Sequence, residues 1–218
     1  MSIKYHISNE ILLSYSAGTL DEAASLLVAT HLALCPHCRS RNNSIDSLGG
    51  HMLDSLEETV ISPTMMSSVL DRIKSDPLPS KTPTQPQLFT NAIIPEPLRS
   101  YVGGDLDTLR WKRVAPRVQQ ISIETVDSRS RARLLRFQSG LTVPAHGHGG
   151  RELTLILTGS LCDRDTVLYR GDIAETDERT EHQPSAGAGE DCICLAVTDA
   201  PLRFKSMLAR LLQPLFGI

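Results

Sequence analysis

The chain has 218 residues, of which 40% are hydrophobic and 22% charged, a composition typical of a folded globular protein. A net charge of −3 and an aromatic content of 4% disfavour a broad basic surface for nucleic acid or an aromatic base-stacking platform. The sequence has neither an apolar run of ~18 residues nor a signal-like start, so we expect a cytoplasmic protein without membrane segments. Its five cysteines are then expected to be reduced thiols or metal ligands.

Proline positions divide the chain into two parts. Six of the 13 prolines lie within residues 77–97, a stretch rich in Ser, Thr and Gln that predicts a semi-rigid linker. Residues 1–76 have helical periodicity, whereas residues 98–218 contain short β-rich runs separated by glycines. We therefore predict an α+β protein with two domains, 1–76 and 98–218, joined by the linker.

Four helices are predicted in the first domain. They begin at the cap residue Ser8, at the capping-box-like stretch Thr19–Glu22, at Pro36, and at Ser62–Pro63. The first helix is expected to end near Gly18 and the third near Leu56.

The fourth predicted helix carries an apolar stripe that contains two methionines. The stripe consists of Met65, Met66, Val69 and Leu70, just before the linker. It either packs in a core or forms an adaptable docking face for a partner.

His31, Cys35 and Cys38 form a compact group of metal-binding residues. His31 and Cys35 share one face of the second predicted helix, and Cys38 follows one turn later. His6 is the predicted fourth ligand, because antiparallel helices return it to the far end of the second helix. Two thiolates and two imidazoles suit a structural Zn²⁺, which contributes on the order of 10 kcal/mol to the folding of a small helical unit. Buried apolar thiols with a core histidine, or a Cys-x-x-Cys redox pair, are the alternatives.

This cluster, together with the stretch Tyr5–Leu20, resembles the zinc-binding anti-sigma domain of bacteria, in its ChrR branch. The resemblance implies a four-helix domain clamped between the two halves of an extracytoplasmic-function (ECF) sigma factor, in a one-to-one complex. Residues 1–76 hold 5 basic and 9 acidic residues, a charge of −4 that fits a basic partner. An ordinary solvated acidic surface is the alternative explanation of that charge.

The second part of the chain is predicted to form an antiparallel sandwich or barrel. The strand candidates are Val118–Val126, Ala132–Phe137, Glu152–Leu157, Thr166–Tyr169, Asp191–Val197 and Leu202–Phe204. The segment Lys205–Gln213 is a candidate for a short closing helix.

A second group of metal-binding residues lies in this part. His146 and His148 are two residues apart, so they face the same side of a strand. Gly149-Gly150 can turn the chain and direct Glu152 to the same point, and His182 follows downstream. We predict that these three histidines and the glutamate bind Zn²⁺ or another divalent transition metal. The alternatives are exposed loop histidines at 146 and 148, and a non-ligand role for His182.

The spacing in Gly140–Gly159 resembles the first sequence motif of the cupins. The second cupin motif is only partly present. Gly171-Asp172 and His182 match it, whereas Asp177 and Arg179 replace the expected proline and glycine. The resemblance implies a C-terminal antiparallel β-barrel or jelly-roll cupin.

The order of zinc domain, proline-rich linker and cupin resembles ChrR-type anti-sigma factors over the whole chain. The resemblance implies that the protein inhibits an ECF sigma factor and that the cupin half mediates its release under oxidative or photooxidative (singlet-oxygen) stress. No catalytic residues, nucleic-acid contacts or membrane contacts are expected. The competing hypotheses are a metal-dependent cupin enzyme, such as a dioxygenase with a zinc-stabilised helical domain, and a DNA-binding regulator.

Cys192 and Cys194 alternate with apolar residues in the predicted strand Asp191–Val197. Both sulfurs are expected on one side of the strand and the apolar side chains on the other. The two thiols serve either as small packing groups or as an oxidation sensor near the metal.

Overall fold

The computed structural model describes residues 2–75, 92–127 and 129–204. Its helices are α1 (Asn9–Ser16), α2 (Glu22–Leu34), α3 (Pro36–Asp54), α4 (Met65–Ser75) and α5 (Glu96–Val102). Its strands are β1 (Lys112–Ala115), β2 (Val118–Ile123), β3 (Arg131–Phe137), β4 (His146–His148), β5 (Glu152–Thr158), β6 (Ser160–Asp163), β7 (Thr166–Tyr169), β8 (Ile173–Thr176), β9 (Glu181–His182), β10 (Ser185–Ala186), β11 (Cys192–Thr198) and β12 (Leu202–Phe204). We call residues 2–75 the helical half and residues 92–204 the β half.

The strands of the β half form three antiparallel sheets. The largest has six strands in the order β1-β2-β3-β11-β5-β8, and the others are β10-β6-β7 and β12-β4-β9. All six predicted strands are present, as β2, β3, β5, β7, β11 and β12. The strands that the sequence did not indicate are short, from two to four residues, so they carry too little alternation to be recognised. A closed barrel stays a prediction.

The beginning of α2 differs from the predicted capping box. Asp21, not Thr19, is the N-cap residue, and its Oδ1 accepts a hydrogen bond of 2.8 Å from the backbone N–H of Ala24. The Thr19 hydroxyl instead donates to the carbonyl of Ser14. Ser8 does occupy the N-cap of α1, but its side chain makes no capping bond. The capping-box prediction was wrong because Asp21, two residues after Thr19, provides the side-chain acceptor for a free N–H of the first turn, that of Ala24.

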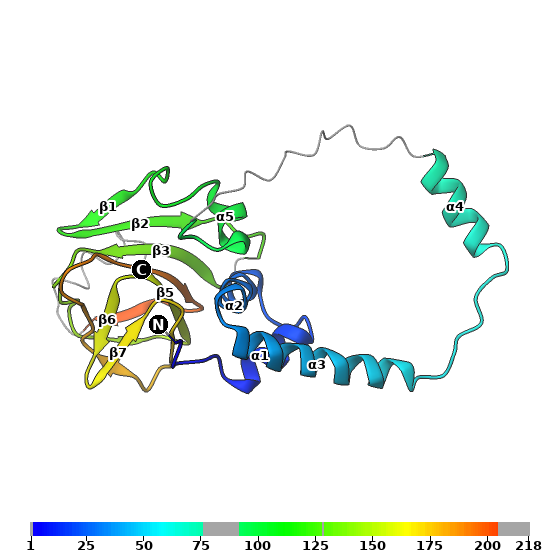
Figure 1. The fold of residues 1–218 in the computed structure, drawn as a ribbon, viewed down its shortest axis with the longest axis horizontal. Coiled ribbons are helices and arrows are strands. Elements are labelled where there is room, and N and C mark those ends of the chain that lie inside the picture. The colour runs from blue at the N-terminus through cyan, green and yellow to red at the C-terminus, as the bar shows by residue number, and fades with distance from the viewer. Residues whose placement is uncertain (1, 76–91, 128, 205–218) are drawn as a thin grey trace.

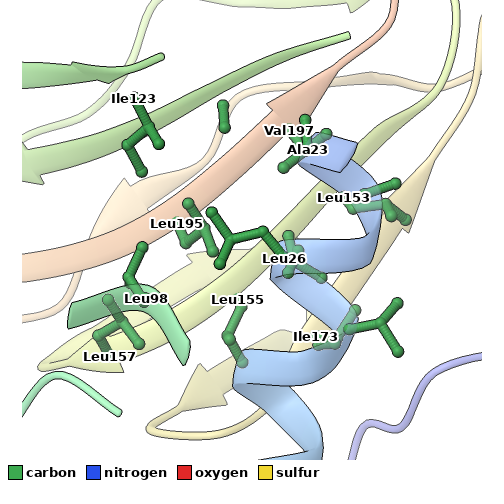
Figure 2. Close-up of a cluster of buried hydrophobic side chains, with 14 of the residues drawn as sticks. Ala23, Leu26, Leu98, Ile123, Leu153, Leu155, Leu157, Ile173, Leu195 and Val197 are labelled. Carbon is green, nitrogen blue, oxygen red and sulfur yellow. The ribbon is translucent and has the colours of Figure 1, made fainter. Parts of the chain in front are cut away.

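The helical half and the β half share one hydrophobic core. Ala23 and Leu26 of α2 point toward the large sheet, where Leu195 of β11 and Leu155 of β5 lie (Figure 2). Leu98 of α5 belongs to the same cluster. The helical half covers one face of β11 and a second hydrophobic cluster covers the other, so all seven residues of the strand are buried.

The long helix α3 and the isolated helix α4 project away from this core (Figure 1). No residue of α4 is buried, so core packing of the Met65–Leu70 stripe is not what the structure shows. Among the helices of the helical half, α1, α2 and α3 pack on one another, and α2 also packs on α5 of the β half. A packed four-helix unit therefore stays a prediction.

The end of the predicted linker is folded onto the β half. Ile94 is fully buried, and its N–H and that of Ile93 donate to the carboxylate of Asp105, while α5 begins at Glu96. Residues 77–91 of the linker and the predicted helix Lys205–Gln213 lie outside the described residues. Within the described part of the chain, no helix combines the length and apolar character required to cross a membrane.

Candidate metal centres

Four side chains from the helical half meet at one point. His31 lies in the last turn of α2, Cys35 is the residue between α2 and α3, and Cys38 lies in the first turn of α3. His6 comes from the extended segment before α1, and the ligand atoms of all four residues lie within 4.8 Å of one another. The break between the helices at Cys35-Pro36 lets residues from both helices point inward.

The spacing within this cluster fits tetrahedral zinc. The Nδ1 atom of His6 lies 3.4 Å from the Cys35 sulfur and 3.5 Å from the Cys38 sulfur. Zn–S bonds of about 2.3 Å and Zn–N bonds of about 2.0–2.1 Å in a tetrahedron place sulfur and nitrogen about 3.5 Å apart. His37 is exposed and its ring lies 4.7 Å from that of His6, beside the cluster.

The tautomer of His31 leaves one ring nitrogen available for a metal. Its Nδ1–H donates a 2.9 Å hydrogen bond to the carbonyl of Gly171, which belongs to the β half. Its Nε2 is buried and has no hydrogen-bond partner among the described residues. Burial lowers the pKa of His31 to about 4, so the imidazole is neutral at pH 7. A buried imidazole lone pair without a partner is unfavourable unless a cation binds to it.

The two thiols complete the donor set. Burial, with a further contribution from Cys35, raises the pKa of Cys38 to about 11. A metal that binds there must therefore displace thiol protons, and in return it gains two thiolates that neutralise its charge. Two sulfurs and two imidazoles, all buried except the half-buried His6, are the donor set of a structural zinc site.

Three imidazoles form the second cluster, in the β half. His146 and His148 lie on β4, and His182 lies on the neighbouring strand β9, directly opposite His146. The Nε2 atom of His182 is 3.1 Å from the Nε2 atoms of both other histidines. Three metal–nitrogen bonds of about 2.0–2.1 Å separate the nitrogens by about 3.0–3.4 Å, so the spacing suits a divalent transition metal.

Hydrogen bonds at the opposite ring nitrogens orient two of these imidazoles. The Nδ1–H of His146 donates to the carbonyl of Pro144 at 2.9 Å, and the Nδ1–H of His182 donates to a carboxylate oxygen of Asp163 at 2.7 Å. The lone pairs of their Nε2 atoms consequently converge. Converging lone pairs repel one another, and a bound cation removes that repulsion.

Glu152 does not join the three converging nitrogens. Its Oε2 lies 3.7 Å from Nδ1 of His148, which is the ring nitrogen that faces away from the cluster, and its Oε1 accepts a bond from the Thr154 hydroxyl. Burial raises the pKa of Glu152. Glu152 therefore stands beside a candidate ligand, and its own ligation of the metal stays a prediction.

A cavity of about 440 Å³ opens next to the second cluster. His146, His182 and Glu152 line it among mainly apolar side chains, and Cys194 contributes from β11. Cys192 and Cys194 pack in one cluster on this side of β11, whereas Leu195 and Val197 pack in the core shared with the helical half. This confirms the predicted division of the strand into a cysteine face and an apolar face.

Comparisons with known proteins agree with this architecture. The family model of the ChrR cupin-like domain matches residues 100–201. The anti-sigma-E factor ChrR of Cereibacter sphaeroides is 43% identical over 221 residues, and the alignment covers 100% of both chains. The crystal structure of Rhodobacter sphaeroides SigE in complex with the anti-sigma ChrR contains a chain that superposes with a TM-score of 0.78 at 39% identity, over 90% of this chain and 99% of that chain.

A helical half with a His/Cys cluster, packed on a cupin-like half, defines an anti-sigma factor that carries a cupin-like domain. The chain belongs to the ChrR family of anti-sigma factors. This membership confirms the resemblance found in the sequence. Because the family is regulatory, it also favours the regulatory prediction over the cupin enzyme.

Proposed function

We propose that the protein binds an ECF sigma factor in a one-to-one complex and prevents it from engaging RNA polymerase. The observation that carries this proposal is the unpaired apolar surface of the helical half. On α4, the side chains of Met65, Met66, Val69, Leu70 and Ile73 are between 45% and 68% exposed. Leu48, Met52 and Leu53 on the outer part of α3 are at least 60% exposed. Exposed apolar groups at this density are typical of a surface that another protein covers.

Two related proteins support the identity of the partner. The similar chain of known structure is in a complex with SigE, and the similar protein of C. sphaeroides is named an anti-sigma-E factor. An amphipathic helix such as α4, with its apolar stripe free, can lie in a groove of a sigma factor. The acidic balance of residues 1–76 assists the approach to a basic partner surface.

The two clusters have different proposed roles. His6, His31, Cys35 and Cys38 would hold a structural Zn²⁺ that fixes the junction of α2 and α3 and so orients α3 toward the sigma factor. His146, His148 and His182 would hold a divalent transition metal, with Glu152 as the proposed fourth ligand or as the partner of His148. Such a metal would supply Lewis acidity next to the cavity.

We further propose that the cupin half receives the signal for release of the sigma factor. The cavity beside the second cluster gives a small oxidant or ligand a route to the three imidazoles and to Cys194. The shared core then transmits a change in the cupin half to α2. Oxidative or singlet-oxygen stress is the proposed signal.

The binding surface is tested by adding one charge to α4. The tagged full-length chain is used to capture proteins from native bacterial extract, a recovered sigma factor is identified by mass spectrometry, and its affinity is then measured by calorimetry. Leu70→Glu is expected to weaken that affinity by at least about tenfold, because it places a carboxylate in an apolar contact. The melting temperature of the free chain should not change, because Leu70 is already exposed.

Ser68→Glu is the matched control, because it adds the same charge to the opposite side of α4. Its affinity for the sigma factor should stay close to that of the unmodified chain.

A parallel capture with the double variant His31→Ala, Cys35→Ala tests whether sigma-factor binding requires the metal cluster. Recovery of no sigma factor by the unmodified chain, or equal losses of affinity in Leu70→Glu and Ser68→Glu, would contradict the proposal.

A further inference from the structure

We infer that the zinc cluster of the helical half is positioned by the cupin half, through the turn Gly171-Asp172 that precedes β8. In this arrangement Asp172 and the Gly171 carbonyl are positioning groups for His6 and His31, the two imidazoles of the cluster. The inference rests on the proposed zinc role of that cluster. It goes further by making zinc retention depend on contact between the two halves.

The first argument is the path of the N-terminal segment. Strand β8 is the outermost strand of the six-stranded sheet, and the segment before α1 runs along it. The N–H of Ile173 donates to the carbonyl of Tyr5 at 3.1 Å, and the N–H of Ser8 donates to Glu175 at 2.7 Å. His6 lies between these two attachment points, so its backbone is held by the cupin half on both sides.

The second argument is the buried carboxylate of Asp172. Its Oδ1 accepts hydrogen bonds from the N–H groups of Lys4, at 2.7 Å, and Tyr5, at 3.0 Å. Its Oδ2 accepts a bond of 2.8 Å from the N–H of Tyr169, and only 2% of the residue is exposed. One carboxylate thus joins the segment that ends in His6 to the turn between β7 and β8. Charge-assisted bonds of this kind are stronger than neutral ones and hold the backbone in place.

The third argument is the close approach at Gly171. Its carbonyl accepts the Nδ1–H of His31, which determines the tautomer and the orientation of that ring. Gly171 has φ of +90°, and a Cβ there would lie 2.5 Å from Cδ1 of Ile3. The turn is itself fixed to β5, because the N–H of Gly171 donates to the carbonyl of Ile156 and the N–H of Ile156 donates to that of Asp172.

The turn therefore acts as a rigid support for both imidazoles. It continues into β8 and, beyond it, to His182 on β9, a member of the second cluster. A displacement of this strand in the cupin half would reach the zinc ligands directly, without passing through the helices.

The test uses Co²⁺ as a spectroscopic probe in the full-length, metal-free chain under reducing conditions. Thiolate-to-cobalt charge transfer reports the cluster with Cys35 and Cys38, because the three imidazoles offer no sulfur. Loss of this band in Cys35→Ser confirms its origin.

Asp172→Ala is expected to weaken Co²⁺ binding at this cluster by at least about tenfold, the size of effect typical of groups that orient metal ligands. Asp172→Asn, which keeps one oxygen acceptor, should weaken it by about threefold or more.

Asp105→Ala is the matched control. The Asp105 carboxylate also accepts two consecutive backbone N–H groups, those of Ile93 and Ile94, but it does not contact the N-terminal segment. Its Co²⁺ affinity should stay within about twofold of the unmodified chain. Unchanged affinity in Asp172→Ala would overturn the inference, as would an equal loss in Asp105→Ala. If Asp172→Ala does not fold, unchanged affinity in Asp172→Asn overturns it.

Capture of a sigma factor by the unmodified chain separates this inference from the proposed function. If the unmodified chain captures a sigma factor but the Asp172 variants keep their Co²⁺ affinity, only the positioning role of Asp172 is contradicted. If the Asp172 variants bind Co²⁺ more weakly but the unmodified chain captures no sigma factor, only the proposed function is contradicted.

Discussion

Burial shifts the pKa of several residues in the two candidate metal clusters. It lowers the pKa of His31 to about 4 and, with a further contribution from the neighbouring imidazoles, that of His148 to about 4. Burial raises the pKa of Cys38 to about 11. At pH 7 the metal-free protein therefore holds His31 and His148 as neutral imidazoles and Cys38 as a thiol that must lose its proton before it binds a metal. Metal affinity at the His/Cys cluster should rise with pH for this reason.

The stability of the metal-free chain should depend on pH through His31. Its pKa is 6.5 when exposed in the unfolded chain and about 4 in the folded chain, so the unfolded state binds more protons between these values. The contribution of neutral His31 to the free energy of unfolding is fully present above pH 6.5 and is lost as the pH drops toward 4. The contribution of one such histidine is roughly 3 kcal/mol. Urea denaturation in the presence of a chelator, from pH 8 to pH 4, measures it.

The variant His31→Gln should show a smaller loss of stability over this range. His51→Gln, which changes an exposed histidine on α3, should keep the full pH dependence. The slope with pH is the deciding quantity, because the absolute stability of His31→Gln also changes. Identical slopes in all three proteins would mean that His31 does not titrate in this way.

At the scale of the elements, α2 carries many of the contacts that join the two halves. Its N-cap residue Asp21 accepts the N–H of Ala24 with one oxygen and the hydroxyl of Ser130, in the β half, with the other. Glu22 in its first turn accepts the Tyr101 hydroxyl. Both acidic residues lie at the positive end of the helix dipole.

Removal of the Asp21 side chain should therefore destabilise the protein more than removal of the Thr19 side chain, which the sequence pattern indicated as the cap. Asp21→Ala is expected to lower the free energy of unfolding by about 1–2 kcal/mol, because the first turn of α2 loses its acceptor. Thr19→Ala, at the residue that the capping-box pattern indicated, should cost less than about 0.5 kcal/mol. Chemical denaturation measures both. A larger effect at Thr19 would contradict the assignment of the cap.

At the scale of the whole molecule, the shared core makes the two halves interdependent. Leu26 of α2 is 4% exposed and packs among the strands of the large sheet (Figure 2). The single tryptophan, Trp111, lies in the β half and packs against the same core. The fluorescence of Trp111 therefore reports on the β half, and circular dichroism reports mainly on the helices.

Leu26→Ala should shift both signals together. We expect the free energy of unfolding to fall by about 2–5 kcal/mol, because the substitution leaves a cavity between α2 and the sheet. Leu53→Ala, on the exposed outer part of α3, should change it by less than about 0.5 kcal/mol. A shift in the helical signal alone would show that the halves unfold independently.

Local features of this protein were largely predictable from the sequence. The predicted helix face shared by His31 and Cys35 was only partly right: Cys35 lies just after α2, but its N–H still donates to the carbonyl of His31, so the two ligand atoms stay close. His146 and His148 share a strand face because of their spacing of two. The alternation at Cys192 and Cys194 predicted the two faces of β11 for the same reason. The missed strands have at most four residues, and two of them, β9 and β10, pair with strands more than 20 residues earlier in the chain.

The sequence by itself indicated which residues are candidate metal ligands and, through the resemblance it supports, the family to which the chain belongs. Side-chain type and helix or strand periodicity are local properties, so they can be read without knowing the fold. Only the tertiary structure decided that Glu152 lies beside His148 and outside the converging nitrogens, that α4 stays exposed, and that Gly171 of one half orients His31 of the other. These relations join residues far apart in the chain, and they depend on how α2 packs on the sheet, which no local pattern encodes.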